Sequence, residues 1–179
     1  MNGSVKLNTR VRFAFFWIFV LAALSLSSAE TVKTSDSTQD KPTAGPSDVI
    51  KDFPALKWEM GFKDVVAVIT KSGASPATFN NNEIAWDGKF SGTAGRATVR
   101  TNESGISQMG VLLYCAEKQD KVFADLQRAL SEKYGDIASE SDTSLDLSKL
   151  WKPGKQIVVE LRKVKDPDSP VITLQWVHE

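Results

Sequence analysis

The sequence is poor in the residues that most enzymes use for chemistry. It holds one cysteine, Cys115, and one histidine, His178, which is the residue before the last. A histidine-based triad needs its histidine in a cleft beside a nucleophile, and a zinc site needs several cysteine or histidine ligands. Among close pairs of acids the first candidates are Glu140 and Asp142, which fall in a polar stretch where solvated charges are the default. We therefore expect no catalytic residue, no metal site and no cofactor, and predict that the chain is not an enzyme.

A single cysteine also excludes an internal disulfide framework. Cys115 follows the apolar stretch "GVLLY", so we expect it to pack as a small hydrophobic side chain at the end of a strand. The alternative is a reactive or intermolecular thiol, but no neighbouring residue type would lower its pKa. The fold must then be held by its core alone, which a region of about 130 residues can supply.

Charges of one sign do not cluster. The sequence has 22 Lys and Arg residues and 22 Asp and Glu residues, with no block of five like charges. Nucleic-acid binding needs a basic patch or stripe, and a surface-bound membrane module needs a basic face. We therefore predict no nucleic-acid partner, and no membrane contact through a basic surface.

The first residues have the pattern of a secretory signal peptide. Lys6, Arg10 and Arg12 precede an apolar run over residues 13–26, and Ser27 and Ala29 stand at the −3 and −1 positions of a cleavage site. The run is shorter than the ~20 residues that a membrane-spanning helix needs. We predict a signal peptide over residues 1–29 and a periplasmic or secreted protein. In the alternative, an uncleaved signal peptide anchors the chain to the membrane.

The next segment, residues 30–48, is rich in Thr, Ser, Asp, Lys and Pro and has almost no apolar side chain. Such a composition cannot bury enough surface to offset its ordering entropy. We predict a disordered linker over residues 30–48 and a folded domain over residues 49–179.

Two helices are predicted in the domain from apolar residues at helical spacing. The first follows Gly61, ends before Gly73, and places four apolar side chains on one face: Phe62, Val65, Val66 and Ile69. The second begins near Asp120, ends at Gly135, and has a similar face: Phe123, Leu126, Leu130 and Tyr134. Glycine is the common residue just past a helix end, because it adopts the left-handed conformation at little cost.

Three strand-like segments follow each helix, at residues 83–92, 95–101 and 106–115, and then at 147–151, 156–164 and 170–177. Residues 136–146 are predicted to be a polar loop. The fold class is therefore α+β, with two helix–three-strand units that form an antiparallel sheet and pack their helices on one face. The opposite face of the sheet is then free, or curved into a shallow groove. The matching order favours an internal repeat over residues 53–115 and 116–179, and the alternative is an α+β domain that merely alternates in this way.

Two stretches resemble a family of small exported bacterial domains that are mostly uncharacterised. In "LKWEMGFKDVVAVI", Trp58, Met60 and Val65 match a "W-G-M-S-x-x-x-V" helix start, although Glu59 and Gly61 depart from it. The second hallmark is a "K-Y-G" helix end followed by a tryptophan strand and an apolar strand. It is carried by Leu126, Leu130, Lys133, Tyr134, Gly135, Trp151, Val159 and Leu161. The resemblance implies an architecture similar to β-lactamase-inhibitor-protein-like folds, and hence binding to a protein partner.

The tryptophans allow two interpretations. Trp58, Trp86 and Trp151 are candidates for a partner interface, because tryptophan often anchors partners; the alternative is that they fill the core. We predict an exported, non-catalytic protein-interaction domain of the bacterial envelope, with an envelope or periplasmic protein as its partner. The alternatives are a periplasmic carrier of a small molecule or lipid, with an apolar pocket, and a hydrolase of unfamiliar type.

Overall fold

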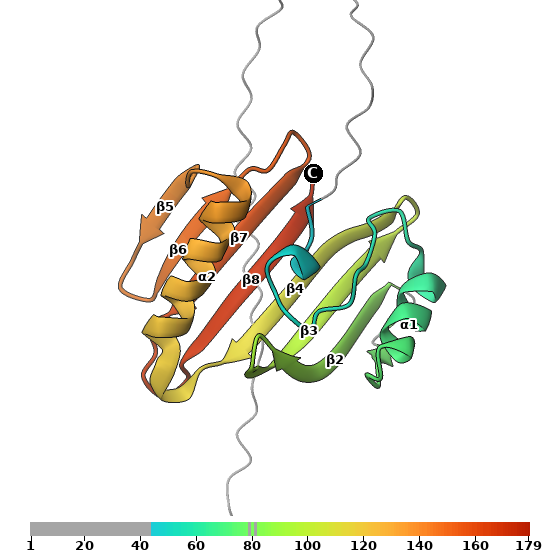
Figure 1. Ribbon diagram of the computed structural model, residues 1–179, viewed down its shortest axis with the longest axis horizontal. Coiled ribbons are helices and arrows are strands. Elements are labelled where there is room, and N and C mark those ends of the chain that lie inside the picture. The colour runs from blue at the N-terminus through green and yellow to red at the C-terminus, as the bar shows by residue number, and fades with distance from the viewer. Residues whose placement is uncertain (1–43, 79, 81) are drawn as a thin grey trace, which may run out of the picture. The chain divides into compact units, whose positions relative to one another are not determined.

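The computed structural model of the chain describes residues 44–78, 80 and 82–179. In this part of the chain, helices cover one side of an eight-stranded antiparallel sheet (Figure 1). The structure is therefore mixed α+β, in agreement with the class that the sequence predicts. The predicted signal peptide, residues 1–29, and residues 30–43 of the predicted linker lie outside the described residues.

The chain runs twice through a helix followed by a group of strands. The first half consists of α1 (Phe62–Lys71), β1 (Ala77–Thr78), β2 (Glu83–Phe90), β3 (Thr93–Asn102) and β4 (Gly105–Tyr114). The second half consists of α2 (Gln119–Tyr134), β5 (Ser139–Asp142), β6 (Asp146–Trp151), β7 (Ile157–Val164) and β8 (Val171–His178). A short 3₁₀ helix precedes each α-helix: Pro46–Asp48 comes before α1, and Ala116–Lys118 comes directly before α2.

The strands lie in the order β1-β2-β3-β4-β8-β7-β6-β5, so β4 and β8 join the two halves at the middle of the sheet. Each helix is followed by four strands, which corrects the prediction of three. The additional strands are the short edge strands β1 and β5, which carry too little apolar patterning to be recognised. The internal repeat over residues 53–115 and 116–179 stays a prediction.

Both helices form where the apolar spacing predicts them. Val65 and Ile69 of α1 are fully buried, and so is Leu130 of α2. Gly73 and Gly135 follow the helices with φ of +87° and +82°, a conformation that costs glycine little. Helix α2 begins at Gln119 and places Asp120 in its first turn. Neither described helix is long and apolar enough to cross a membrane.

Strand β5 lies within the predicted polar loop 136–146, and the loop prediction is wrong there. Its sequence "SESD" has no apolar residue, and all four residues are exposed. The strand is held by its backbone pairing with β6 and by an ion pair between Glu140 and Lys149, whose Oε2 and Nζ atoms lie 2.7 Å apart. Strands without a buried face leave no periodic signal in a sequence.

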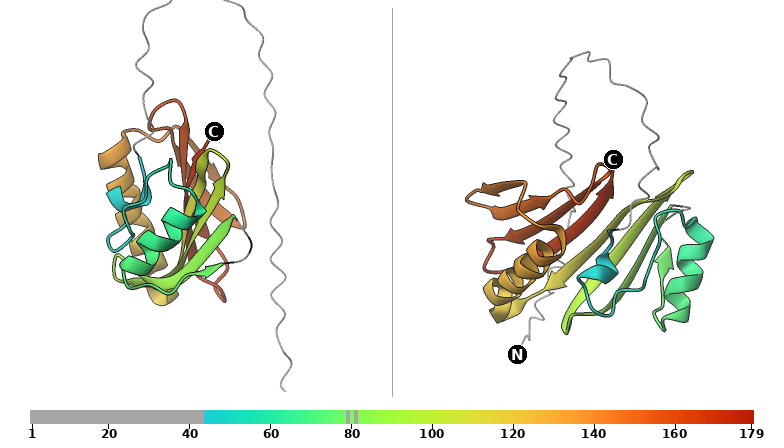
Figure 2. Two further views of the ribbon diagram at one scale, coloured as in Figure 1. Left: turned by 90° about the vertical axis from the view of Figure 1, so that its right-hand side faces the viewer. Right: turned by 45° about the horizontal axis from the view of Figure 1, so that its top comes forward.

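The two helices and the lead-in segment 44–60 all pack on the same face of the sheet (Figure 2). Helix α2 lies against β7 and β8. Its last residue, Tyr134, accepts a hydrogen bond from Trp176 Nε1 of β8 at 3.1 Å and donates one to the carbonyl oxygen of Gly45 at 3.3 Å. Tyr134 thereby ties α2 to the sheet and to the lead-in. Burial of its hydroxyl raises the pKa of Tyr134 to about 12, so it stays protonated.

The lead-in belongs to the folded part, so the prediction of a disordered linker is wrong for residues 44–48. Ala44 is buried, and its carbonyl oxygen accepts a hydrogen bond from Trp58 Nε1 at 2.8 Å. Gly105 at the start of β4 allows this segment to approach. A Cβ atom there would lie 2.3 Å from the carbonyl oxygen of Trp58, and the φ of Gly105 is +125°. The Trp58 carbonyl instead accepts a hydrogen bond from Ile106 N at 2.6 Å.

Candidate functional site on the uncovered sheet face

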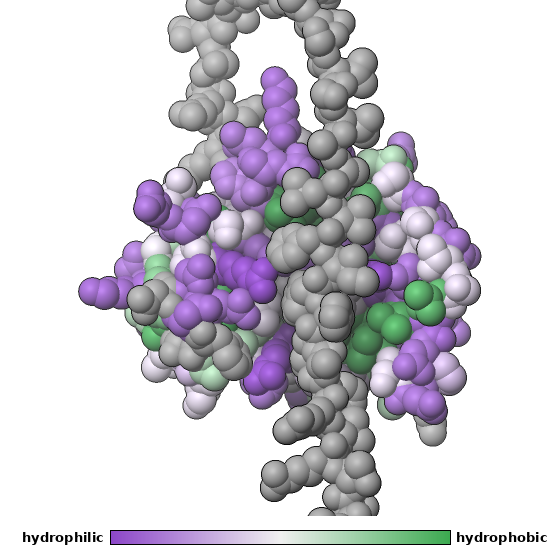
Figure 3. Space-filling view, turned by 180° about the vertical axis from the view of Figure 1, so that it is seen from behind, coloured by the Kyte–Doolittle hydropathy of each residue, from purple (hydrophilic) through white to green (hydrophobic). Residues whose placement is uncertain are grey.

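The candidate site is the face of the sheet that no described element covers. Successive side chains of a strand point to opposite faces. Strand β7 buries Ile157, Val159 and Leu161 on the helix side, so Val158 and Glu160 point to the other face. Figure 3 views the molecule from this side, and the coloured residues visible there include both hydrophilic and hydrophobic ones. We call this face of the sheet the uncovered face.

The strand register places the members of the uncovered face. Across its middle, one row of residues runs from β3 to β6: Thr98, Gly110, Gln175, Glu160 and Leu150. Within this region Gln108 Nε2 donates to Gln175 Oε1 at 3.2 Å, which connects β4 to β8. The hydrogen bond crosses the junction of the two halves, so the uncovered face is continuous from one half to the other.

Three arginine–carboxylate pairs fix most of the charge on this face. Arg100 Nε lies 2.9 Å from Glu83 Oε2, and Arg96 Nε lies 3.3 Å from Asp87 Oδ1. In the second half, Arg162 Nε donates to Asp146 Oδ2 at 2.8 Å, and an Arg162 terminal nitrogen contacts the same oxygen. The three pairs lie on the two sides of the central strands β4 and β8: Glu83–Arg100, Asp87–Arg96 and Asp146–Arg162.

These pairs contribute little to stability, since partly exposed ion pairs are typically worth about 0.2–1 kcal/mol. The hydrogen bonds that Arg162 donates to Asp146 lower the pKa of this carboxyl group, so it stays charged well into acid. Each pair restrains a long arginine side chain at the surface of the sheet. A surface whose side chains are already ordered loses less entropy when a partner binds.

Glu160 differs from the other carboxylates of the uncovered face. It is partly buried, and among the described residues it makes no hydrogen bond or ion pair. Desolvation by burial raises the pKa of Glu160; Arg162 acts in the opposite sense and Asp146 adds to the rise. The residues directly opposite it, Gln175 on β8 and Leu150 on β6, carry no charge.

Apolar side chains lie between the polar ones. Val177 of β8 stands directly opposite Val158 of β7, and Tyr114 of β4 stands opposite Val171 of β8. Tyr114 is 48% exposed and Val177 is 37% exposed, which is high for large apolar side chains. A non-obligate protein interface is about as apolar as the rest of a protein surface, so this mixture is compatible with such an interface.

The three tryptophans predicted for an interface do not lie on the uncovered face. Trp58, Trp86 and Trp151 are 5%, 4% and 0% exposed, on the helix side of the sheet. Trp86 packs with its ring centroid 5.5 Å from that of Phe53. Trp58 lies 5.6 Å from the ring of His178. The interface assignment is therefore corrected: strand alternation turns Trp86 and Trp151 toward the core, and Trp58 is buried with the lead-in on the same side.

The residues that carry chemistry do not come together. His178 is the last residue of β8 and lies against Trp58 rather than beside an acid or a nucleophile. Cys115 is buried, and burial raises the pKa of its thiol. Glu140 and Asp142 are each paired with a lysine. Within residues 44–78, 80 and 82–179, no three His, Cys, Asp or Glu side chains are grouped to hold a metal ion.

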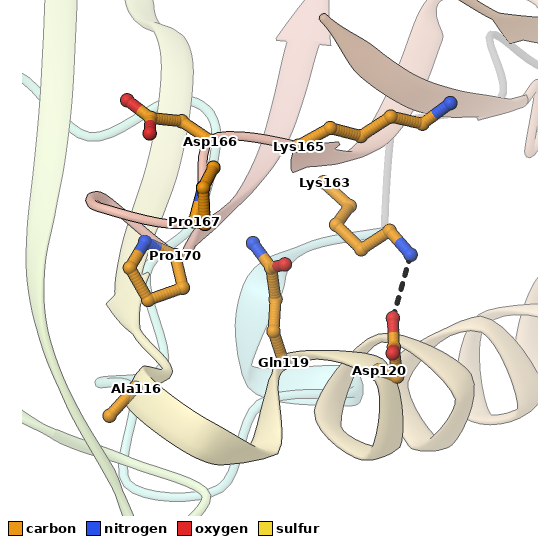
Figure 4. Close-up of a pocket in the computed structure, with 8 residues that line it drawn as sticks. All are labelled: Ala116, Gln119, Asp120, Lys163, Lys165, Asp166, Pro167 and Pro170. Atoms are coloured by element: carbon orange, nitrogen blue, oxygen red, sulfur yellow. Dashed lines mark hydrogen bonds and ion pairs between the residues drawn. The ribbon is translucent and has the colours of Figure 1, made fainter. Parts of the chain in front are cut away.

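A polar cavity of about 300 Å³ lies between the start of α2 and the β7–β8 hairpin (Figure 4). Its polar side chains are engaged within the domain. Gln119 Nε2 donates to the carbonyl oxygens of Val164 and Val171 at 2.8 and 2.9 Å, and Lys163 Nζ lies 2.7 Å from Asp120 Oδ1. These contacts brace the helix start against the hairpin. We therefore regard this cavity as a packing feature between the helix and the hairpin rather than as a ligand site.

A second cavity of about 310 Å³ is bordered by Ala44, Asp48, Lys133, Tyr134 and Pro153. Sites for drug-sized ligands measure about 300–1,000 Å³ and are mostly apolar. Both cavities stand at the lower limit of that range and are lined by charged and polar groups. Neither gives support to the carrier hypothesis, which requires an apolar pocket.

Comparisons of the chain with known protein families, with curated protein sequences and with solved structures found no match. The resemblance to small exported bacterial domains therefore stays a prediction. The uncovered face was anticipated by the sequence only as a free sheet surface. Glu160 was missed, although the alternation in "IVVELRKV" places it opposite to Ile157, Val159 and Leu161.

Proposed function

We propose that the chain is a non-catalytic protein-interaction domain of the bacterial envelope, which binds another envelope protein through the uncovered face of its sheet. The observation that carries the proposal is the face itself. It is broad, it is covered by no described element, and its charges are held in place by three ion pairs. Export to the periplasm or beyond rests on the predicted signal peptide and is part of the same proposal.

The size of the face suits a protein partner. Six strands, β2, β3, β4, β8, β7 and β6, each present three or four side chains to it. At a strand spacing of about 4.8 Å and a two-residue repeat of about 6.8 Å, each outward residue occupies about 33 Å². The face therefore measures several hundred Å². One partner's share of a standard protein–protein interface is about 800 Å².

The mixture of groups on the face supports a protein partner over a lipid surface. A lipid-binding face would be continuously apolar or rimmed with unpaired cations. Here the apolar positions Tyr114, Val171, Val158 and Val177 alternate with amides and with paired charges. The resemblance to β-lactamase-inhibitor-protein-like architecture implies the same kind of activity, binding to a protein partner.

Site-specific photo-crosslinking in cells of the source organism tests the proposal. A benzophenone amino acid replaces Tyr114, which is an exposed aromatic residue of the uncovered face. The matched control places it at Ala124, an exposed residue on the outer side of α2. We expect one crosslinked protein from position 114 and none from position 124. No crosslink at 114, or equal crosslinking at both positions, would overturn the proposal.

A further inference from the structure

Glu160 is the feature of the uncovered face that the fold leaves unexplained. The other acids of this face, Glu83, Asp87 and Asp146, each have an arginine. Glu160 has none, although it is partly buried and lies in the middle of β7. Taking a carboxylate partly out of water without a partner is unfavourable. A sheet surface that only had to be soluble would be served better by threonine or glutamine at this position.

No charge on the neighbouring strands balances Glu160. On β8 the nearest positions of this face hold Thr173, Gln175 and Val177, which do not titrate. On β6 they hold Ser148 and Leu150, with Asp146 further along. Arg162, two residues along β7, directs its guanidinium to Asp146 at 2.8 Å rather than to Glu160. The nearest cation is thus already in use.

The surroundings of Glu160 suit the aliphatic part of a long cationic side chain. Val158 and Leu150 flank it, and Val177 stands opposite Val158. Lysine and arginine pack their methylene stems on apolar surface while the charged end reaches a polar group. On the far side of Gln175 in the same row, Gly110 has no side chain and is itself buried, with Thr98 and Gln175 beside it.

We propose that Glu160 anchors the partner of the uncovered face, by pairing with a lysine or arginine that the partner presents between apolar residues. The proposal rests on the proposed function, because it needs a protein bound to this face. Arginine fits best, since its planar guanidinium bonds a carboxylate through two parallel hydrogen bonds. The partner surface is then basic at its centre and apolar around it, the complement of Glu160 and its neighbours.

Binding of this kind depends on pH in a defined sense. Burial raises the pKa of Glu160 in the free domain, whereas a bound cation favours its charged form. Binding therefore releases a proton when the pH lies near this raised pKa, and the affinity falls as the pH is lowered through it. Asp146 titrates at lower pH, because Arg162 lowers its pKa. The Thr173, Gln175 and Val177 side chains of β8 add no titration.

The test uses the protein that the photo-crosslinker at position 114 captures, purified and titrated against the whole exported chain by calorimetry. Glu160→Gln should weaken binding by about 30-fold or more, since truncating one member of a desolvated charge pair is costly. Glu160→Lys should abolish binding. The matched control, Glu132→Gln on the exposed side of α2, should bind as the unaltered protein does. Thermal unfolding of each variant verifies that it is folded.

The pH profile gives a second readout that a structural role for Glu160 would not produce. The affinity of the unaltered protein should fall toward acid, and that of the Glu160→Gln variant should be level over the same range. Binding of Glu160→Gln within threefold of the unaltered protein, or equal pH profiles, would overturn the inference and leave the proposed function standing. Failure of the crosslink at position 114 would overturn both.

Discussion

The two faces of the sheet use the same strands for different purposes. On the helix side, Val111, Leu174 and Leu161 of three neighbouring strands form one buried row. The next row of the antiparallel sheet faces the other way and is partly or well exposed: Leu112, Thr173 and Arg162. A core needs apolar groups that fill space, whereas a docking face needs ordered polar groups with apolar groups between them. Substitutions on the helix side should therefore affect mainly stability, and substitutions on the uncovered face should affect mainly binding.

The largest expected effect compares adjacent residues of β8. Trp176 is fully buried and donates a hydrogen bond to Tyr134, while Val177 points to the uncovered face. Trp176→Ala should lower the free energy of unfolding by about 3–5 kcal/mol, because it leaves a large cavity. Val177→Ala should change it by about 0.5 kcal/mol or less. Urea denaturation measures both, and similar losses would contradict the assignment of the two faces.

The next effect compares two glycines. A Cβ atom on Gly95 would lie 2.4 Å from the carbonyl oxygen of Leu112, so the backbone itself must move. Gly95→Ala should cost about 1–3 kcal/mol by overpacking. At Gly110, on the uncovered face, the nearest atom would be the Thr98 hydroxyl at 3.2 Å, which can rotate away. Gly110→Ala should be within about 0.5 kcal/mol of the unaltered protein in the same denaturation experiment.

A smaller effect compares ion pairs on the two faces. Lys149 faces the helix side with its side chain 10% exposed and pairs with Glu140, while Arg100 is 33% exposed and pairs with Glu83. Glu140→Gln should cost about 1–2 kcal/mol, because it leaves a mostly buried ammonium without its counter-charge. Glu83→Gln should cost about 0.5 kcal/mol or less. Thermal unfolding at low salt measures both losses of stability. A larger loss for Glu83→Gln than for Glu140→Gln would contradict this comparison.

The smallest effect concerns Glu160 and pH. Its raised pKa means that the folded state binds more protons than the unfolded state between the ordinary pKa and the folded one. Stability from this group is therefore present at low pH and is lost as the pH rises through the folded pKa. The free energy of unfolding of Glu160→Gln should be about 0.5 kcal/mol higher than that of the unaltered protein at pH 7. The two proteins should be equally stable at pH 4, and a Glu160→Gln variant that is less stable than the unaltered protein at pH 7 would argue against an unpaired carboxylate.

Much of the fold could be predicted from local patterns. The helical spacing of Val65 and Ile69, and of Leu126 and Leu130, locates both helices, since each has one apolar stripe. Alternation locates the long strands for the same reason. Strand β5 could not be found in this way, because its four residues are exposed and it exists through its pairing with β6. The strand order could not be predicted, because it depends on contacts between segments that are distant in the sequence, such as β4 and β8.

The candidate site was less accessible to prediction. Tryptophan type alone suggested an interface at Trp58, Trp86 and Trp151, but the alternation of their own strands and the lead-in bury them. Glu160 stands at an outward position that the same alternation identifies. Its importance depends on the absence of a partner across the strands, which only the register of β6, β7 and β8 makes visible.

The most direct test of binding at the uncovered face is hydroxyl-radical footprinting of the complex with the crosslinked partner. Tyr114, which lies on the face, and Leu145, which is 75% exposed in the β5–β6 turn, serve as the two reporters. Tyr114 should become protected from oxidation when the partner binds, and Leu145 should react as it does in the free domain. Protection of Leu145 with Tyr114 unchanged would place the partner elsewhere and contradict the role proposed for this face.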